Sequence, residues 1–187
     1  MSTKVKLQNV RLFFPDLFEP VKFDAQGEFR FGATFGILKT DTAQLKLIED
    51  AIKVEATEAW KAKAGTMVAG MRNNANKFCF TDGDTKSYDG TEGAMLLSAR
   101  RKAKDGRPYV VDRAKNPLAE KDGVIYSGCY VNAVVELWAQ AKDYPGIRCT
   151  LLGVQFFADG DSFSGATKPN PDDFEEIAEG ADSGELA

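Results

Sequence analysis

The segment from residue 28 to 38 constrains the fold most strongly, because large apolar residues alternate along it with small or polar ones. A period of two residues is typical of a β-strand with one buried face. The apolar face carries Phe29, Phe31, Ala33, Phe35 and Ile37. The opposite face carries Gly32 and Gly36, and glycine within a strand indicates sharp curvature or the close approach of another backbone. Either feature suits a small barrel.

Two further segments precede residue 70. Residues 4–14 also read as a strand, and its apolar face changes sides, which predicts a bulge near Gln8. Residues 42–64 form the one long helical pattern, with apolar residues at spacings of three and four. We expect Asp41 to cap this helix and Gly65 to end it.

The pattern after residue 70 is consistently β. Strands are expected over residues 77–80, 94–102, 107–112, 125–139 and 147–157. Asp105-Gly106 predicts a hairpin between residues 94–102 and 107–112. Residues 142–146 predict a second hairpin with a longer loop. About six strands and one helix indicate a mainly β, α+β chain that closes into a compact antiparallel barrel.

The composition excludes several kinds of catalytic site. The chain has no histidine, so neither a Ser-His-Asp triad nor a mixed Cys/His zinc site can form. Its three cysteines, widely spaced, indicate reduced thiols in a cytosolic protein. Phosphate-binding and dinucleotide-binding glycine motifs are absent from the sequence. We therefore predict no enzymatic activity, no cofactor and no metal.

Asp82 and Asp84 are the one acidic pair that invites a catalytic interpretation. Asp82-Gly83-Asp84 resembles the start of a calcium loop, but Lys86 stands where an oxygen ligand is needed. We expect a turn there. The sequence also has no apolar run long enough for export or for crossing a membrane, which predicts a cytoplasmic location.

The net charge of −4 is unevenly distributed. Residues 169–187 contain seven acids and no base, so residues 1–168 carry a net charge of +3. This division predicts a folded domain over residues 1–168 and a disordered acidic tail over 169–187. A tethered acidic chain can compete with phosphate for a basic groove, or can simply improve solubility. The tail candidates are Asp172, Asp173, Phe174, Glu175 and Glu176.

Five basic residues lie within residues 100–107. On a strand, Arg100 and Lys102 share one face, and Tyr109 shares a face with Arg107. Cations beside aromatic rings are what single-stranded nucleic acid requires, because cations neutralise phosphates and rings stack on unpaired bases. A charged hairpin tip also keeps a sheet edge from aggregating, and that alternative stays open. The expected contacts are Arg100, Lys102, Lys104 and Arg107, with Arg72 and Lys77 weaker, and the stacking candidates are Tyr109, Tyr88, Tyr130 and Phe80.

Several segments together resemble the phage single-stranded DNA-binding proteins grouped as DUF2815, which are similar in role and architecture to that of phage T7. The resemblance covers most of residues 5–165. It is carried by Asp82-Gly83-Asp84 with Tyr88 and Gly90, by residues 107–112, by residues 125–133 (Ile-Tyr-Ser-Gly-Cys-Tyr-Val-Asn-Ala), by Gly153-Val154-Gln155 and by Asp159-Gly160.

The resemblance implies an OB-fold barrel that binds single-stranded DNA without strong sequence preference during phage replication, recombination and repair. It also implies an acidic tail that recruits replication proteins and restrains duplex binding. The chain departs from such tails in ending at Leu186-Ala187 without a terminal Phe. An RNA-binding module, a protein-interaction barrel and a metal-dependent nuclease stay open as alternatives, as do weaker duplex binding and a homodimer.

Overall fold

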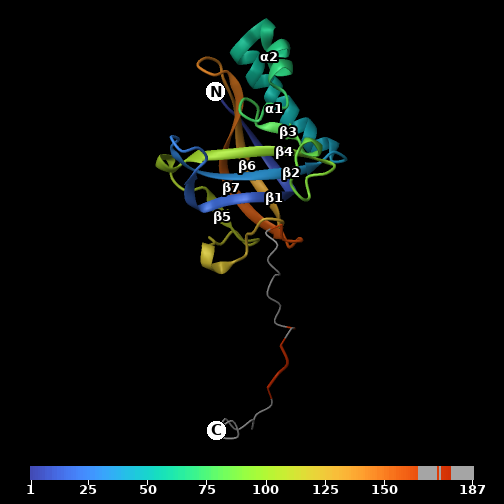
Figure 1. Ribbon diagram of the computed structural model, residues 1–187, viewed down its shortest axis with the longest axis vertical. Helices are drawn as coiled ribbons and strands as arrows, with labels where there is room; N and C mark the ends of the chain where they lie inside the picture. The colour runs from blue at the N-terminus through green and yellow to red at the C-terminus, as the bar shows by residue number, and fades with distance from the viewer. Residues whose placement is uncertain (164–171, 173, 178–187) are drawn as a thin grey trace.

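The computed structural model describes residues 1–163, 172 and 174–177, and Figure 1 shows the path of the chain. The described residues form seven strands, two α-helices and four short 3-10 helices. The strands are β1 (Thr3–Lys22), β2 (Phe29–Leu38), β3 (Phe80–Asp82), β4 (Ala94–Lys102), β5 (Tyr109–Val111), β6 (Tyr130–Gln140) and β7 (Gly146–Ala158). The helices are α1 (Thr42–Trp60), α2 (Ala64–Met71), η1 (Lys61–Lys63), η2 (Gly83–Thr85), η3 (Ala103–Asp105) and η4 (Glu120–Asp122).

Five of the strands close into a barrel. The sheet has the order β3-β4-β2-β1-β6-β7-β5, and an additional parallel pairing of Arg100 in β4 with Thr150 in β7 joins its two sides. The closed strands are β1, β2, β4, β7 and β6, while β3 and β5 extend the sheet at β4 and β7. A five-stranded barrel of this kind is the OB-fold architecture, so the predicted fold is confirmed.

The core follows the predicted alternation. On β2, Phe31, Ala33, Phe35 and Ile37 are buried, whereas Phe29 at the start of the strand is exposed. On β6 the alternating set from Val131 to Leu137 is buried in the same core. The stripe of α1 centred on Ile48 and Ile52 is buried, and α1 contacts β1 and β6 at one end of the barrel (Figure 1).

The helical region differs from the prediction at its C-terminal end. Asp41 caps α1 as expected, accepting a hydrogen bond from the backbone N–H of Gln44. The helix stops at Trp60 because Lys61 adopts a positive φ of 52°, and a second helix, α2, then contains Gly65. The prediction that Gly65 ends the helix is therefore wrong.

The predicted bulge in the first strand is confirmed. The register of β1 against β6 shifts between Leu7 and Val10, and Asn9 between them has a φ of 50°. The backbone N–H of Asn9 donates to the side chain of Asn132 on β6. The bulge lets the strand change its buried face and continue to Lys22, well beyond the expected end.

The predicted hairpin around Asp105-Gly106 is wrong. The strands on either side of this turn do not pair with each other, since β4 pairs with β2 and β3, and β5 pairs in parallel with β7. Arg101 holds the turn closed by donating to the backbone oxygens of Asp105 and Gly106. The second predicted hairpin is confirmed, because β6 and β7 pair along their length.

Candidate nucleic-acid interface

A groove with a volume of about 880 Å³ runs across the outer face of β2 and β4 and onto the beginning of β7. The loop between β1 and β2 (residues 23–28) lines one end, through Phe23, Asp24, Gly27 and Glu28. The end of β6 and the start of β7 contribute Trp138 and Arg148. This is the face of an OB-fold barrel that is suited to oligonucleotides, because the second and third barrel strands and the adjoining loops surround it.

Six basic residues line the groove: Arg30 on β2, Arg100, Arg101 and Lys102 on β4, Arg148 on β7, and Lys86 after η2. Arg30 faces Lys102 in the register of the two strands, and Gly32 faces Arg100. Partial burial, and after it the like charges of Arg30 and Arg148, lower the pKa of Arg100 below its ordinary value. An arginine nevertheless stays protonated. The groove therefore concentrates positive charge.

Three acids, Asp24, Glu28 and Asp105, also line the groove and partly offset this charge. The carboxylate of Glu28 lies 3.3 Å from the Lys102 ammonium and 3.9 Å from the Arg30 guanidinium. Within the described part of the chain, Arg100 forms no ion pair with an acid. No acid therefore competes with an anion from solution for Arg100.

An aromatic ring lies on the floor of the groove because Gly32 has no side chain. A Cβ atom at Gly32 would come within 2.8 Å of the Phe23 ring, so only glycine lets this ring rest on β2. The Arg100 guanidinium lies over the same ring, 3.9 Å from its centroid. The predicted close approach at this glycine is therefore made by a side chain, and 42% of Phe23 remains exposed.

Two more rings meet where the groove borders β1. Phe14 and Tyr88 pack edge to face with centroids 5.0 Å apart, and about half of each side chain is exposed. Phe14 has a φ of 48°, which is costly for a bulky residue and is found where the surroundings hold it in place. A third ring, Trp138, is oriented by a hydrogen bond from its indole N–H to the Thr150 hydroxyl.

The structure places three of the predicted contact residues in the groove and seven outside it. Arg100, Lys102 and Tyr88 line the groove. Lys104, Arg107 and Tyr109 are exposed on η3, the following loop and β5, beyond its edge.

Four predicted contacts lie elsewhere for clear reasons. Phe80 is 2% exposed in the core, so its prediction as a stacking ring is wrong. Tyr130 is covered by Arg11, which lies 5.0 Å from the ring centroid. Arg72 makes a two-pronged ion pair with Glu49, which raises the arginine's pKa, and Lys77 is exposed outside the groove.

The tail candidates that the structure describes, Asp172, Phe174, Glu175 and Glu176, are exposed and do not line the groove. Asp173 lies outside the described residues. Sequence reasoning missed Arg30, Arg148, Phe23 and Phe14. Of these residues, only Arg30 could have been recognised from the sequence, because it shares the polar face of its strand with Gly32.

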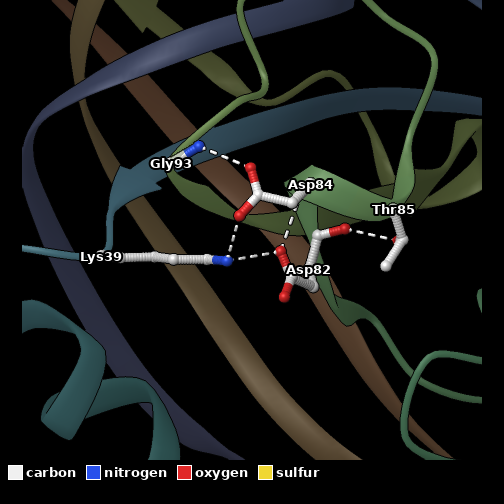
Figure 2. Close-up of polar contacts among 5 residues, drawn as sticks. All are labelled: Lys39, Asp82, Asp84, Thr85 and Gly93. Atoms are coloured by element: carbon white, nitrogen blue, oxygen red, sulfur yellow. Dashed lines mark hydrogen bonds and ion pairs between the residues drawn. The ribbon is translucent and has the colours of Figure 1, made fainter.

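Asp82 and Asp84 each form an ion pair with Lys39 instead of an open acidic site (Figure 2). The Lys39 ammonium lies 2.8 Å from Asp82 and 2.5 Å from Asp84, and Asp84 also accepts from the backbone N–H of Gly93. The hydrogen bonds from Lys39 lower the pKa of both carboxyls and raise that of Lys39. The described residues contain no group of three or more potential metal ligands.

The cysteines are poor nucleophiles. Burial raises the pKa of Cys79 to about 12, and it also raises the pKa of Cys129 and Cys149. All three are free thiols. In the described part of the chain, no helix has the length and apolar character needed to span a bilayer.

The groove can therefore hold a flexible polyanion with flat apolar groups. Its cations can neutralise phosphates, and its partly exposed rings can stack on bases that are not paired with a second strand. Fold and site together define an oligonucleotide-binding barrel. The chain belongs to the family of the single-stranded DNA-binding protein of Enterobacter phage Enc34, whose model matches residues 3–186.

Similar proteins agree with this assignment. Protein p50 of Acyrthosiphon pisum secondary endosymbiont phage 1 is 43% identical over 176 residues, which are 94% of each chain. The single-stranded DNA-binding protein of bacteriophage Enc34, solved in complex with single-stranded DNA, is 28% identical with a TM-score of 0.71, covering 86% of this chain and 89% of the other. The predicted resemblance to phage single-stranded DNA-binding proteins is confirmed.

A more distant structure shares the fold alone. It is gp2.5, a single-stranded DNA-binding protein encoded by bacteriophage T7, with 12% identity and a TM-score of 0.55. The match covers 96% of this chain and 97% of gp2.5.

Proposed function

We propose that this chain binds single-stranded DNA, without strong sequence preference, in the groove over β2, β4 and β7. The observation that carries the proposal is the presence of six basic residues and several partly exposed rings in one groove of an OB-fold barrel. The Enc34 relative, which was solved with single-stranded DNA bound, supports it.

The groove residues divide into two roles. Arg100 and Arg148 bind phosphates, and Arg30 and Lys102 join them when phosphate replaces the carboxylate of Glu28. Phe23, and the pair formed by Phe14 and Tyr88, stack on bases. Both kinds of contact are tolerant of sequence, because every nucleotide has a phosphate and every base has a flat face. Duplex DNA hides its base faces and should bind more weakly.

The biological setting follows from the family. The protein acts in the infected bacterial cell, where it coats DNA exposed during phage replication, recombination and repair, and it catalyses no reaction. Residues 169–187, with seven acids, act as a tail that modulates DNA binding to the domain of residues 1–168 and recruits replication proteins. The tail tunes binding because a tethered polyanion has a high effective concentration near the groove.

A salt titration with a charge-matched pair of variants tests the groove. The double variant Arg100→Ala/Lys102→Ala removes two groove cations, and the control Lys53→Ala/Lys63→Ala removes two exposed cations of the helical region. The slope of log affinity against log salt should fall by about 1.4 for the groove variant, at about 0.7 per phosphate contact, and stay unchanged for the control. Equal slopes for both variants would contradict the proposed site.

The same titration distinguishes the ligands. Single-stranded DNA, duplex DNA and RNA of equal length are compared by fluorescence anisotropy. Tighter binding to single-stranded DNA than to duplex supports the role of the rings. Equal affinity for RNA would favour the RNA-binding alternative, because the 2′-hydroxyl is the group by which a protein distinguishes RNA from DNA.

A further inference from the structure

Tyr109 on β5 is an exposed aromatic ring that lies outside the groove. Its side chain is 82% exposed, which is unusual for a ring on a strand. It packs beside Gly153 of β7, where a Cβ atom would lie 3.3 Å from the Cβ of Tyr109. Gly153 therefore gives β5 room to lie close to β7, and the tyrosine projects outward from that contact.

The groove and Tyr109 lie on the same edge of β7. Arg100 of β4 pairs with Thr150, and Tyr109 of β5 pairs with Gly153, so β4 and β5 occupy successive stretches of one edge. Three residues of strand separate the two positions by about 10 Å. The next pair inward, Val110 and Val154, is buried in the core, so Tyr109 faces the outside of the barrel.

Exposed basic residues continue from the groove toward Tyr109. Arg107 lies two residues before Tyr109, on the same side of the chain, and both Arg107 and Lys104 are exposed. Arg101 fixes the loop that carries them by holding the backbone of Asp105 and Gly106. On the other edge of β7, Thr150 pairs with Glu136, whose charge repels phosphate. The electrostatics therefore favour a path along the edge of β4 and β5.

We propose that Tyr109, with Arg107 and Lys104, forms a second stacking site, which receives an unpaired base of the strand after it leaves the groove. This inference rests on the proposed function and adds a direction to it. The bound strand crosses Arg100 and Thr150 and continues along β7 toward Gly153. Short oligonucleotides fill the groove alone, and only longer ones reach Tyr109.

A length series tests the second site. The full-length protein and its variants are titrated by anisotropy with oligothymidylates from about 4 to about 16 nucleotides, the range of site sizes for one OB-fold. Mass measurement restricts the analysis to complexes of one protein with one oligonucleotide. Tyr109→Ala should bind the shortest oligonucleotides like the wild type and lose about 5- to 150-fold on the longer ones. Tyr109→Phe keeps the ring and should bind every length like the wild type.

Two results would overturn the second site. If Tyr109→Ala weakens the shortest oligonucleotides as much as the longest, the ring belongs to the groove contacts. If Tyr109→Ala binds every length like the wild type, the ring contacts no base. Failure of the proposed function looks different, because Arg100→Ala/Lys102→Ala would then leave binding unchanged at every length.

Discussion

Gly32 and Gly36 lie on the outer face of β2, and a methyl group at either position would collide with an aromatic ring. The new Cβ would lie 2.8 Å from the Phe23 ring at Gly32 and 2.7 Å from the Phe13 ring at Gly36. The two collisions are almost equal, but the rings differ in freedom. Phe13 is 1% exposed and stacks on Phe163 at 4.9 Å, whereas 42% of Phe23 is exposed.

Opposite outcomes are therefore expected from the same substitution. In Gly36→Ala the buried ring cannot move away, and overpacking costs about 1–3 kcal/mol, offset by about 0.4–1 kcal/mol from the stiffer unfolded chain. The free energy of unfolding should fall, and DNA affinity should not change. In Gly32→Ala the Phe23 ring swings toward solvent, so stability changes little. Losing its contact with Arg100 costs about 0.5–1 kcal/mol of stability, which the stiffer unfolded chain offsets. Because the displaced ring no longer lies where a base can stack on it, affinity for single-stranded DNA should fall about fivefold or more, at about 1 kcal/mol or more per stacked base.

Urea unfolding followed by circular dichroism gives the stabilities, and anisotropy with an oligothymidylate gives the affinities. Gly36→Ala should lower the free energy of unfolding and leave DNA affinity unchanged. Gly32→Ala should lower DNA affinity and leave the free energy of unfolding nearly unchanged. If Gly32→Ala lowers the urea midpoint as much as Gly36→Ala does, the greater exposure of the Phe23 ring does not protect the protein from a loss of stability. If Gly36→Ala weakens DNA binding while remaining folded, the groove extends further along β2 than the structure indicates.

Three further predictions concern the tail, the ion pair and the core. Deleting residues 169–187 should tighten DNA binding, most clearly at low salt and for duplex, and unchanged affinities would refute competition by the tail. Lys39→Met should lower the urea midpoint near neutral pH, and the difference from the wild type should shrink only as the pH falls below about 4. The sign follows because Asp82 and Asp84 have folded pKa values below the ordinary 3.8, so their stabilisation is present above that pH and lost as pH falls through the depressed values. Phe80→Ala should cost about 3–5 kcal/mol of stability without changing the affinity of the folded protein, and a selective loss of binding would restore Phe80 to the interface.

The strands could be predicted where burial repeats along the sequence. The alternation in residues 28–38 and 130–140 reports a buried face directly, and both segments are strands. The turn at Asp105-Gly106 could not be interpreted in this way, because a turn signal is local and the choice of partner strand is not. Since β7 offers a free edge to β5, the chain returns there instead of to β4.

The candidate site shows the same division between local and distant causes. Arg100 and Lys102 could be predicted because both are basic and lie two residues apart on one strand, which places them on the same face. Phe23 could not, since it belongs to a loop and becomes part of the groove only by lying on Gly32. Phe80 was misassigned because a strand of three residues is too short for alternation to tell its buried face from its exposed one.

The barrel is closed by a single backbone pairing between β4 and β7, and this pairing lies in the groove. The residue pair that joins β4 to β7 consists of Arg100 and Thr150, and both residues line the groove. A barrel that opens locally should open where the fewest backbone bonds cross, so the amides of β4 and β7 should exchange with solvent by a low-energy opening. An oligonucleotide that contacts both β4 and β7 should stabilise the closed barrel against this local opening. Its measured affinity then depends on the free energy difference between the closed and the locally opened barrel.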